Sequence, residues 1–120
     1  MEYLSEKLKQ RTKELALRTI RTLRALPKSD EARVIGRQLL RSATSVAANY
    51  RAVCRSRSRA EFISKIGTVV EEADETVFWL EMLLDTELLQ TAEVHSLLAE
   101  ANELLAIFAA SLHTAKANKK

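Results

Sequence analysis

The most regular feature of this sequence is the spacing of its apolar residues, which recur at every third or fourth position over long segments. Such spacing places apolar side chains on one face of an α-helix. A half-buried strand would instead show alternation with a period of two, and no segment shows it. We therefore predict four helices, over residues of about 5–25, 30–55, 59–86 and 92–117.

Local signals mark the ends of these helices. Pro27 is the only proline in the chain, and the residue before a proline is pushed away from helical geometry. Ser58 and Glu61 match a capping box, in which the serine hydroxyl and the glutamate carboxylate each accept a hydrogen bond from a free amide. Thr91 is a suitable N-cap for the last helix.

Short connections between long amphipathic helices favour an all-α fold, an up-down-up-down four-helix bundle. The 120 residues are enough for a single domain spanning residues 1–120. Some apolar side chains lie off the main stripes of their helices. They belong either to a broad buried face or to a subunit interface, which exposed apolar patches usually mark. The candidates for an oligomer interface are Leu17, Phe78, Trp79 and Met82.

Charge is distributed unevenly along the chain, although the net charge is only +3. Residues 1–60 hold 15 Lys+Arg and 5 Asp+Glu, a balance of +10, whereas residues 61–120 hold 4 and 11, a balance of −7. A split this large indicates either a charged partner or pairing between the two halves of the protein.

Arginines also line one face of the second predicted helix, opposite its apolar face. At about 100° per residue these side chains fall within an arc of roughly 80°. In the bundle, Arg37 and Arg41 are level with the acidic segment 71–75 of the third helix, so we expect both to form ion pairs there. The arginines of this face are Arg33, Arg37, Arg41, Arg51, Arg55 and, if the helix continues far enough, Arg59.

An up-down bundle brings together the start of helix one, the end of helix two, the start of helix three and the end of helix four. That end collects 12 of the 19 basic residues and 4 of the 16 acidic ones. A basic pole of this kind attracts phosphates and releases their counterions. We predict non-catalytic binding of RNA or DNA phosphates, mostly independent of sequence; the alternative is a pole that only aids solubility. The residues expected to contact phosphates are Lys7, Arg11, Lys13, Arg51, Arg55, Arg57 and Arg59.

Residues with catalytic chemistry are sparse. Cys54, the single cysteine, has no evident histidine partner, so we expect a small buried residue and a reducing, cytoplasmic setting. His95 and His113 stand about 27 Å apart along one helix, too far to share a site. No glycine-rich phosphate loop is present, and no apolar run approaches the roughly 18 residues of a membrane span. We expect no enzyme, no cofactor, no metal and no membrane partner.

One acidic constellation leaves a less favoured enzymatic alternative. Carboxylates three residues apart share a helix face, and such pairs can hold magnesium. All-helical nucleotide pyrophosphohydrolases use sites of this kind. The carboxylates in question are Glu71, Asp74, Glu72 and Glu75 on the third helix, with Glu100 and Glu103 on the fourth.

Several spaced segments resemble one known family over nearly the whole chain. They read Ala-Leu-Pro-Lys at 25–28, Val-Ile-Gly-Arg-Gln-Leu-Leu-Arg-Ser-Ala-Thr-Ser-Val-Ala-Ala-Asn-Tyr-Arg-Ala at 34–52, Ala-Glu-Phe-Ile-Ser-Lys-Ile at 60–66 and Glu-Glu-Ala-Asp-Glu-Thr-Val-Phe-Trp-Leu-Glu at 71–81. In these segments the chain is similar to the bacterial four-helix bundle proteins encoded in intervening sequences of 23S ribosomal RNA genes. The same fold family includes the accessory variability determinant of diversity-generating retroelements.

The resemblance implies more than the residue pattern does. That relative forms a homopentamer, binds nucleic acid and associates with a reverse transcriptase, so a homopentamer with a basic surface or pore is implied here. The family has no catalytic residues to carry over. Its motif residues Asn49, Tyr50 and Arg51 match here, as do Glu72, Asp74 and Glu75. A second function hypothesis is an adaptor whose Trp79–Met82 surface docks a reverse transcriptase or another partner.

Overall fold

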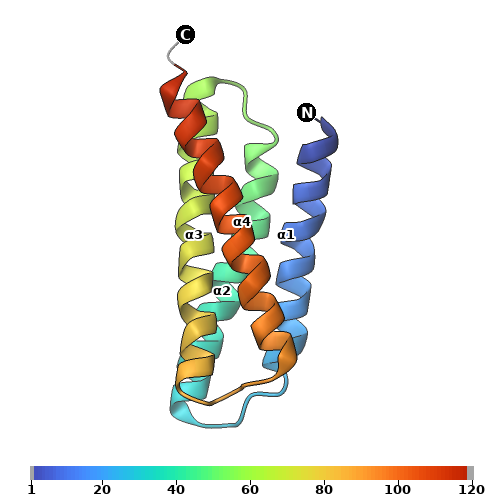
Figure 1. The fold of residues 1–120 in the computed structure, drawn as a ribbon, viewed down its shortest axis with the longest axis vertical. Helices are drawn as coiled ribbons and strands as arrows, with labels where there is room; N and C mark the ends of the chain where they lie inside the picture. Colours follow the sequence, from blue (N-terminus) through green and yellow to red (C-terminus); the bar gives the residue numbers. More distant parts are fainter. Residues whose placement is uncertain (1, 119–120) are drawn as a thin grey trace.

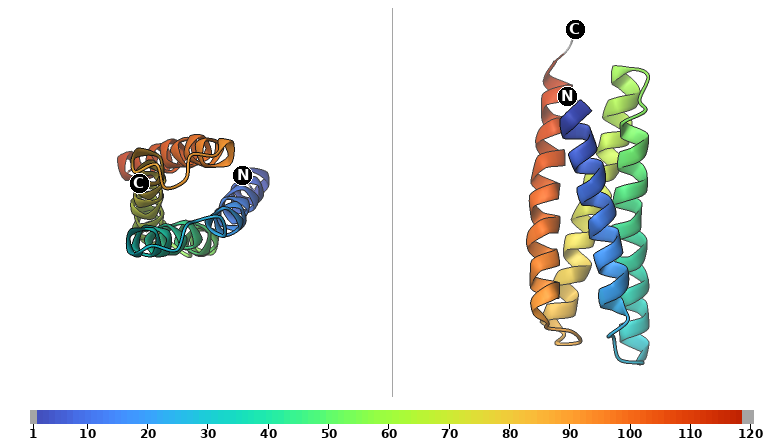
Figure 2. Two further views of the ribbon diagram at one scale, coloured as in Figure 1. Left: turned by 90° about the horizontal axis from the view of Figure 1, so that it is seen from below. Right: turned by 90° about the vertical axis from the view of Figure 1, so that its right-hand side faces the viewer.

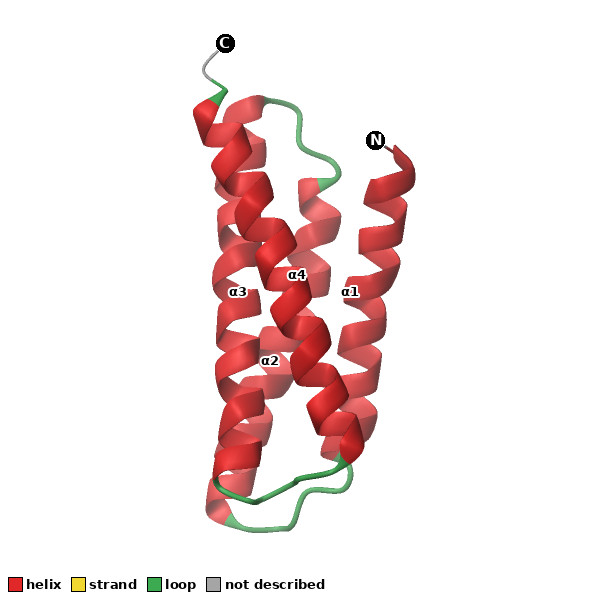
Figure 3. Cartoon of the chain, in the orientation of Figure 1, coloured by secondary structure: helices red, strands yellow, loops and turns green. Residues whose placement is uncertain are grey.

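The computed structural model describes residues 2–118, with side chains from residue 4 onward, and forms a four-helix bundle measuring 51 × 22 × 19 Å. Its helices are α1 (Glu2–Leu23), α2 (Asp30–Val53), α3 (Arg59–Asp85) and α4 (Ala92–Ala117). They run alternately up and down and are joined by short loops (Figures 1 and 3). The all-α bundle predicted from the sequence is therefore confirmed, and no strand occurs among the described residues.

Each helix packs beside its neighbours in sequence, so that α1 and α3 lie diagonally across the bundle, as do α2 and α4 (Figure 2). The contact between α1 and α4 closes the ring and is sparser than the other three contacts between adjacent helices. This arrangement determines which side chains from distant parts of the sequence can meet.

The helix starts follow from side-chain caps. The hydroxyl of Ser29 accepts a hydrogen bond from the Ala32 amide at 3.2 Å, and the hydroxyl of Thr91 accepts one from the Val94 amide at 3.3 Å. The hydroxyl of Ser58 likewise accepts from the Glu61 amide at 3.0 Å. These bonds satisfy amides that have no partner within their own helix.

The predicted capping box at the start of α3 is confirmed in one of its two bonds. The Glu61 carboxylate accepts its hydrogen bond from the amide of Arg57, at 2.6 Å, and not from the amide of the cap residue itself. The carboxylate therefore reaches one residue further back and holds the α2–α3 turn. This contact fixes the backbone of a basic segment at the start of α3.

The first two helices end slightly earlier than predicted. After Leu23 the amides of Arg24, Ala25 and Leu26 bond to carbonyls three residues back, at 3.1–3.2 Å, which tightens the last turn before Pro27. After Val53 the amide of Arg55 does the same with the Ala52 carbonyl at 3.1 Å. The last basic residues of the α2 segment consequently lie in a turn.

The core draws apolar side chains from all four helices. The ring of Tyr50 on α2 packs against that of Phe108 on α4, with centroids 5.1 Å apart. Burial, followed by the nearby charge of Cys54, raises the pKa of Tyr50 to about 12. Tyr50, one of the residues that match the family motif, thus serves packing. The largest fully buried side chains are Phe108, Leu15, Leu39, Ile66, Leu80, Leu83, Leu97 and Leu104.

Candidate nucleic-acid interface

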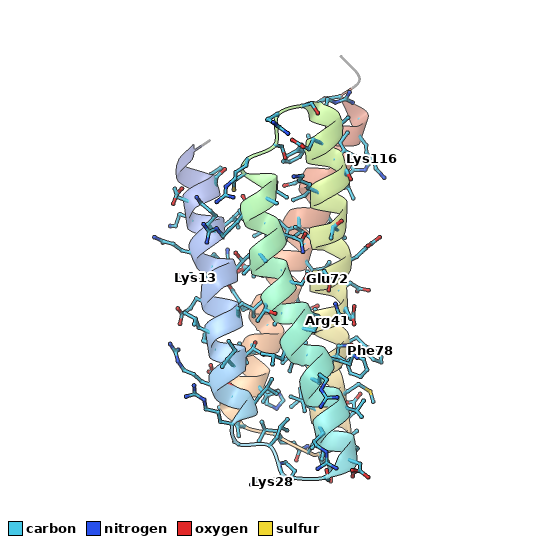
Figure 4. The ribbon with its side chains drawn as sticks, turned by 180° about the vertical axis from the view of Figure 1, so that it is seen from behind. Lys13, Lys28, Arg41, Glu72, Phe78 and Lys116 are labelled. Atoms are coloured by element: carbon cyan, nitrogen blue, oxygen red, sulfur yellow. The ribbon has the colours of Figure 1, made fainter. Side chains whose placement is uncertain are left out.

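The start of α1, the end of α2, the start of α3 and the end of α4 lie at the same end of the bundle, as predicted (Figure 1). Figure 4 shows Lys116 near this end and Lys28 at the opposite end. Lys119 and Lys120, which the sequence also assigns to the pole, lie outside the described residues. The basic pole is therefore a real spatial grouping, but its members differ in what surrounds them.

Arg11 is held by acids of α4. Its guanidinium donates to Glu100 at 2.8 and 2.9 Å and also to Glu103. The hydrogen bond that Arg11 donates to Glu100, opposed by partial burial and supported by Glu103, raises the pKa of Arg11. Two carboxylates already neutralise this arginine. It joins α1 to α4 and is a weaker candidate for phosphate contact than the sequence predicts.

Arg59 is also engaged within the chain. It is the first residue of α3 and does not extend the arginine face of α2, because the helix has already ended. Its guanidinium donates to the backbone carbonyl of Ala115 at 3.0 and 3.1 Å. That carbonyl lies in the last turn of α4, where helix carbonyls lack internal partners. Arg59 therefore caps α4 and keeps its charge without a carboxylate partner among the described residues.

Lys13, Arg51 and Arg55 come together along a groove between α1 and α2, which has a volume of about 610 Å³. All three side chains are exposed, and none forms an ion pair within the described part of the chain. Between the cations the groove is lined by Ala47, Ala48 and Ala52. We call this feature the α1/α2 groove.

An ion pair, formed by Lys9 and Glu6, also borders the α1/α2 groove. Lys9 lines it and pairs with Glu6 at 2.8 Å, so this pair adds little net charge. The charge of the α1/α2 groove is consequently set by its three other cations. Because they come from two helices, a ligand lying in the groove would meet positive charge on both sides.

The remaining predicted contact residues flank this groove. Arg57 is exposed in the α2–α3 turn, and its amide is fixed by the Glu61 carboxylate. Lys7 is exposed on α1 and lines a second groove of about 500 Å³, together with Arg11, Lys13 and Leu17. The structure therefore places the predicted cations at one end while dividing them between two grooves and a turn.

The middle of the arginine face is neutralised in part. Arg41 pairs with Glu72 at 3.2 Å and also with Glu75 on α3, which confirms the expected ion pair (Figure 4). The hydrogen bond from Arg41, followed by one from the Trp79 indole, lowers the pKa of Glu75. The expectation for Arg37 is wrong, because this exposed side chain forms no ion pair with any described residue. Arg37 lies about one helical turn before Arg41 on α2, and only Arg41 is level with Glu72 and Glu75 of α3.

The acidic constellation proposed as a magnesium site is divided between arginines. Glu72 and Glu75 face Arg41, whereas Glu100 and Glu103 face Arg11. No group of three or more histidines, cysteines, aspartates or glutamates gathers in metal-binding geometry among the described residues. Four of the six carboxylates therefore act as partners of arginine, whereas Glu71 and Asp74 are exposed and form no ion pair with a described residue.

The four apolar interface candidates do not form one surface. Leu17 is half-buried on α1, and the other three lie on α3, diagonally across the bundle. Trp79 and Met82 pack partly against the core, whereas Phe78 is 48% exposed and contacts the Trp79 ring edge-on, with centroids 4.8 Å apart. Figure 4 shows Phe78 on the outside of α3.

Cys54 is exposed, so its predicted burial is wrong. Its place on the helical wheel suggests an inward position only if α2 continues past it. The helix ends at Val53, and Cys54 is its C-cap, at the start of the α2–α3 turn. The thiol borders a small pocket with Ser5, Glu6 and Lys9.

The sequence analysis does not predict two features of the structure. The first is the pairing of α1 with α4, in which Arg18 meets Glu93 at 2.8 Å in the same register as Arg11 and Glu100. Two arginines seven residues apart, opposite two glutamates seven residues apart, are its signal in the sequence. The second is the alanine lining of the α1/α2 groove, whose signal is the run of small residues between Arg41 and Arg51.

The comparisons with known proteins agree on a family. The family model described as 23S rRNA-intervening sequence protein matches residues 6–110. The chain is also similar to a crystal structure of a protein with unknown function from the S23 ribosomal protein family of Bacteroides thetaiotaomicron. That match has 31% sequence identity and a TM-score of 0.79, and covers 88% of this chain and 97% of the other. No curated protein matches the sequence.

Proposed function

The chain belongs to the 23S rRNA-intervening sequence protein family, and from this premise we propose that it is a non-catalytic accessory protein that binds RNA or DNA backbones through its basic pole. The binding is electrostatic and largely independent of sequence. It needs no cofactor. The main contacts are Lys13, Arg51, Arg55 and Arg57, which form no ion pair with a described carboxylate, and the grouping of the first three along one groove is the observation that supports the proposal best.

The physical case rests on how the charges are divided. A cation that already faces two carboxylates gains little from a phosphate, because the phosphate must displace or repel those acids. Arg11 is in this position, and Arg51, Arg55 and Arg57 are not. Guanidinium groups also match phosphate oxygens with two parallel hydrogen bonds. We therefore place the main contact on the α1/α2 groove and the adjoining α2–α3 turn, with Lys7 and Arg59 at its borders.

The second part of the proposal is self-association. Phe78 exposes about half of its surface on α3, although aromatic side chains of this size are usually well buried. We propose that this surface contacts another subunit of a homo-oligomer, with a pentamer as the expected form; docking of a reverse transcriptase or another protein is the alternative use. Light scattering checks this directly, because a monomer at all concentrations would contradict the homo-oligomer.

Charge reversal at the groove tests the nucleic-acid proposal. The triple variant Arg51→Glu, Arg55→Glu, Arg57→Glu replaces three exposed cations that hold no other helix in place. Each lost phosphate contact should weaken binding, so we expect the affinity for a labelled RNA oligonucleotide, measured by fluorescence anisotropy at low salt, to fall by at least about 100-fold. Circular dichroism should show an unchanged helical content.

A matched control separates location from net charge. The triple variant Arg24→Glu, Lys28→Glu, Arg37→Glu makes the same change in net charge toward the other end of the bundle, again with exposed side chains. We expect this variant to bind within a few-fold of the parent protein. Equal losses in the two triple variants would show that net charge alone governs binding, and the basic pole would no longer be the site.

A further inference from the structure

We propose that the α1/α2 groove holds an unpaired, single-stranded segment of nucleic acid, and that the protein therefore prefers single strands to duplexes. This inference rests on the proposed function and specifies its ligand. It is carried by the shape and lining of the groove, which combine cations on both sides with a strip of alanine methyl groups between them.

The first argument is charge placement. Lys13 approaches the groove from α1, and Arg51 and Arg55 approach it from α2. A chain of phosphates lying lengthwise between the helices would have a cation within reach on either side. The α2 wall runs from Thr44 to Arg55, which is about 16 Å at the ~1.5 Å rise of a helix. That length matches roughly five nucleotides of a strand that keeps the ~3.4 Å stacked spacing of one duplex strand, and fewer of a more extended strand.

The second argument is the apolar lining. Ala47, Ala48 and Ala52 present methyl groups, and Ala48 is exposed to solvent. A ligand that offered only phosphates would make no use of these methyl groups. An unpaired strand offers sugars and base faces that can cover these methyl groups, whereas a duplex keeps its base faces stacked inside. Among the side chains that the structure describes, no aromatic one lines the groove, so affinity per nucleotide should be modest and insensitive to base identity.

The third argument is curvature. The groove is a hollow between two packed helices, whose axes lie about 8–10 Å apart in such contacts. A duplex is convex and wider than this separation, so it can touch the cations at the rim but cannot reach the alanines. A single strand can enter the hollow. The volume of about 610 Å³ is ample for part of such a strand.

The experiment compares single-stranded and duplex probes of about 15 nucleotides, a length within the range covered by known single-strand sites. Fluorescence anisotropy with labelled oligo-uridine, oligo-thymidine and a mixed-sequence duplex gives the three affinities at one salt concentration. We expect both single strands to bind at least about tenfold more tightly than the duplex.

Variants of the groove lining make the test specific. Ala48→Leu fills the groove without changing charge, and leucine is nearly as good a helix former as alanine. We expect it to weaken single-strand binding about tenfold and to leave duplex binding unchanged. The matched control is Ala106→Leu, an exposed alanine on α4 away from the groove, which should alter neither affinity.

Each contrary result has a definite meaning. Duplex binding as tight as single-strand binding, or no effect of Ala48→Leu, overturns the single-strand inference while the proposed function survives. If no probe binds at low salt, the proposed function itself fails. If Ala48→Leu instead changes the mass measured by light scattering, the groove is occupied by a second copy of the chain, and the single-strand inference is again overturned.

Discussion

At the scale of single residues, the arginines of this protein divide into two classes that look identical in the sequence. Arg11, Arg18 and Arg41 bridge helices by pairing with glutamates, whose side chains are between 19% and 64% exposed. Ion pairs of this kind contribute less than about 1 kcal/mol each. Their larger effect is to determine which cations remain available to a ligand. The arginines of the α1/α2 groove remain available because they form no ion pair with a described carboxylate.

The pairing of Glu75 predicts a pH-dependent contribution to stability. Because Arg41 and the Trp79 indole lower its pKa in the folded state, the stabilisation is present at neutral pH and is lost as the pH falls through the carboxylate range. The variant Glu75→Gln should therefore melt slightly below the parent protein at pH 7, and the two melting temperatures should converge once the pH falls below the ordinary glutamate pKa of about 4.3.

Asp74→Asn is the matched control, because Asp74 is exposed and forms no ion pair with the described residues. Its melting temperature should follow that of the parent protein closely at neutral pH. Thermal melts followed by circular dichroism provide the comparison. A deficit of Glu75→Gln that stays constant down to acidic pH would mean that packing around the side chain, and not its charge, is responsible.

At the scale of helices, the sequence predicts the number, order and direction of the elements because the apolar spacing and the caps at Ser29, Ser58 and Thr91 act locally. The ends of α1 and α2 are less predictable. Arg55 and Cys54 continue the helical pattern, yet the chain already turns after Val53. Where a helix stops depends on how the next helix must be placed, and that information is not local.

Gly67 offers a test of the helical account of α3. A methyl group added there would meet no atom within 4 Å, so Gly67→Ala should raise the free energy of unfolding by about 1 kcal/mol through helix propensity alone. Gly36→Ala should gain less, because its added methyl would lie 2.8 Å from a terminal carbon of Leu26. Urea denaturation measures both; a destabilised Gly67→Ala variant would contradict an ordinary helix at this position.

At the scale of the whole molecule, the basic first half and the acidic second half of the sequence give rise to two structural features. In the middle of the bundle the two halves pair between helices, through Arg41 on α2 and Arg11 on α1. At the end of α2 the basic half forms a cationic groove. The sequence predicts the basic pole because up-down topology determines which segments meet. It does not predict the groove, because the separation of α1 from α2 there depends on small residues such as Ala47 and Ala48.

The salt dependence of RNA binding by the intact protein is the most direct test of the central claim. Each phosphate contact in a single strand contributes about −0.7 to the slope of log affinity against log salt, so contacts by Lys13, Arg51, Arg55 and Arg57 predict a slope of roughly −3 per subunit. The triple variant Arg51→Glu, Arg55→Glu, Arg57→Glu keeps only the Lys13 contact and should retain about a quarter of that slope. Undetectable binding at low salt, or an affinity that does not change with salt, would contradict the account.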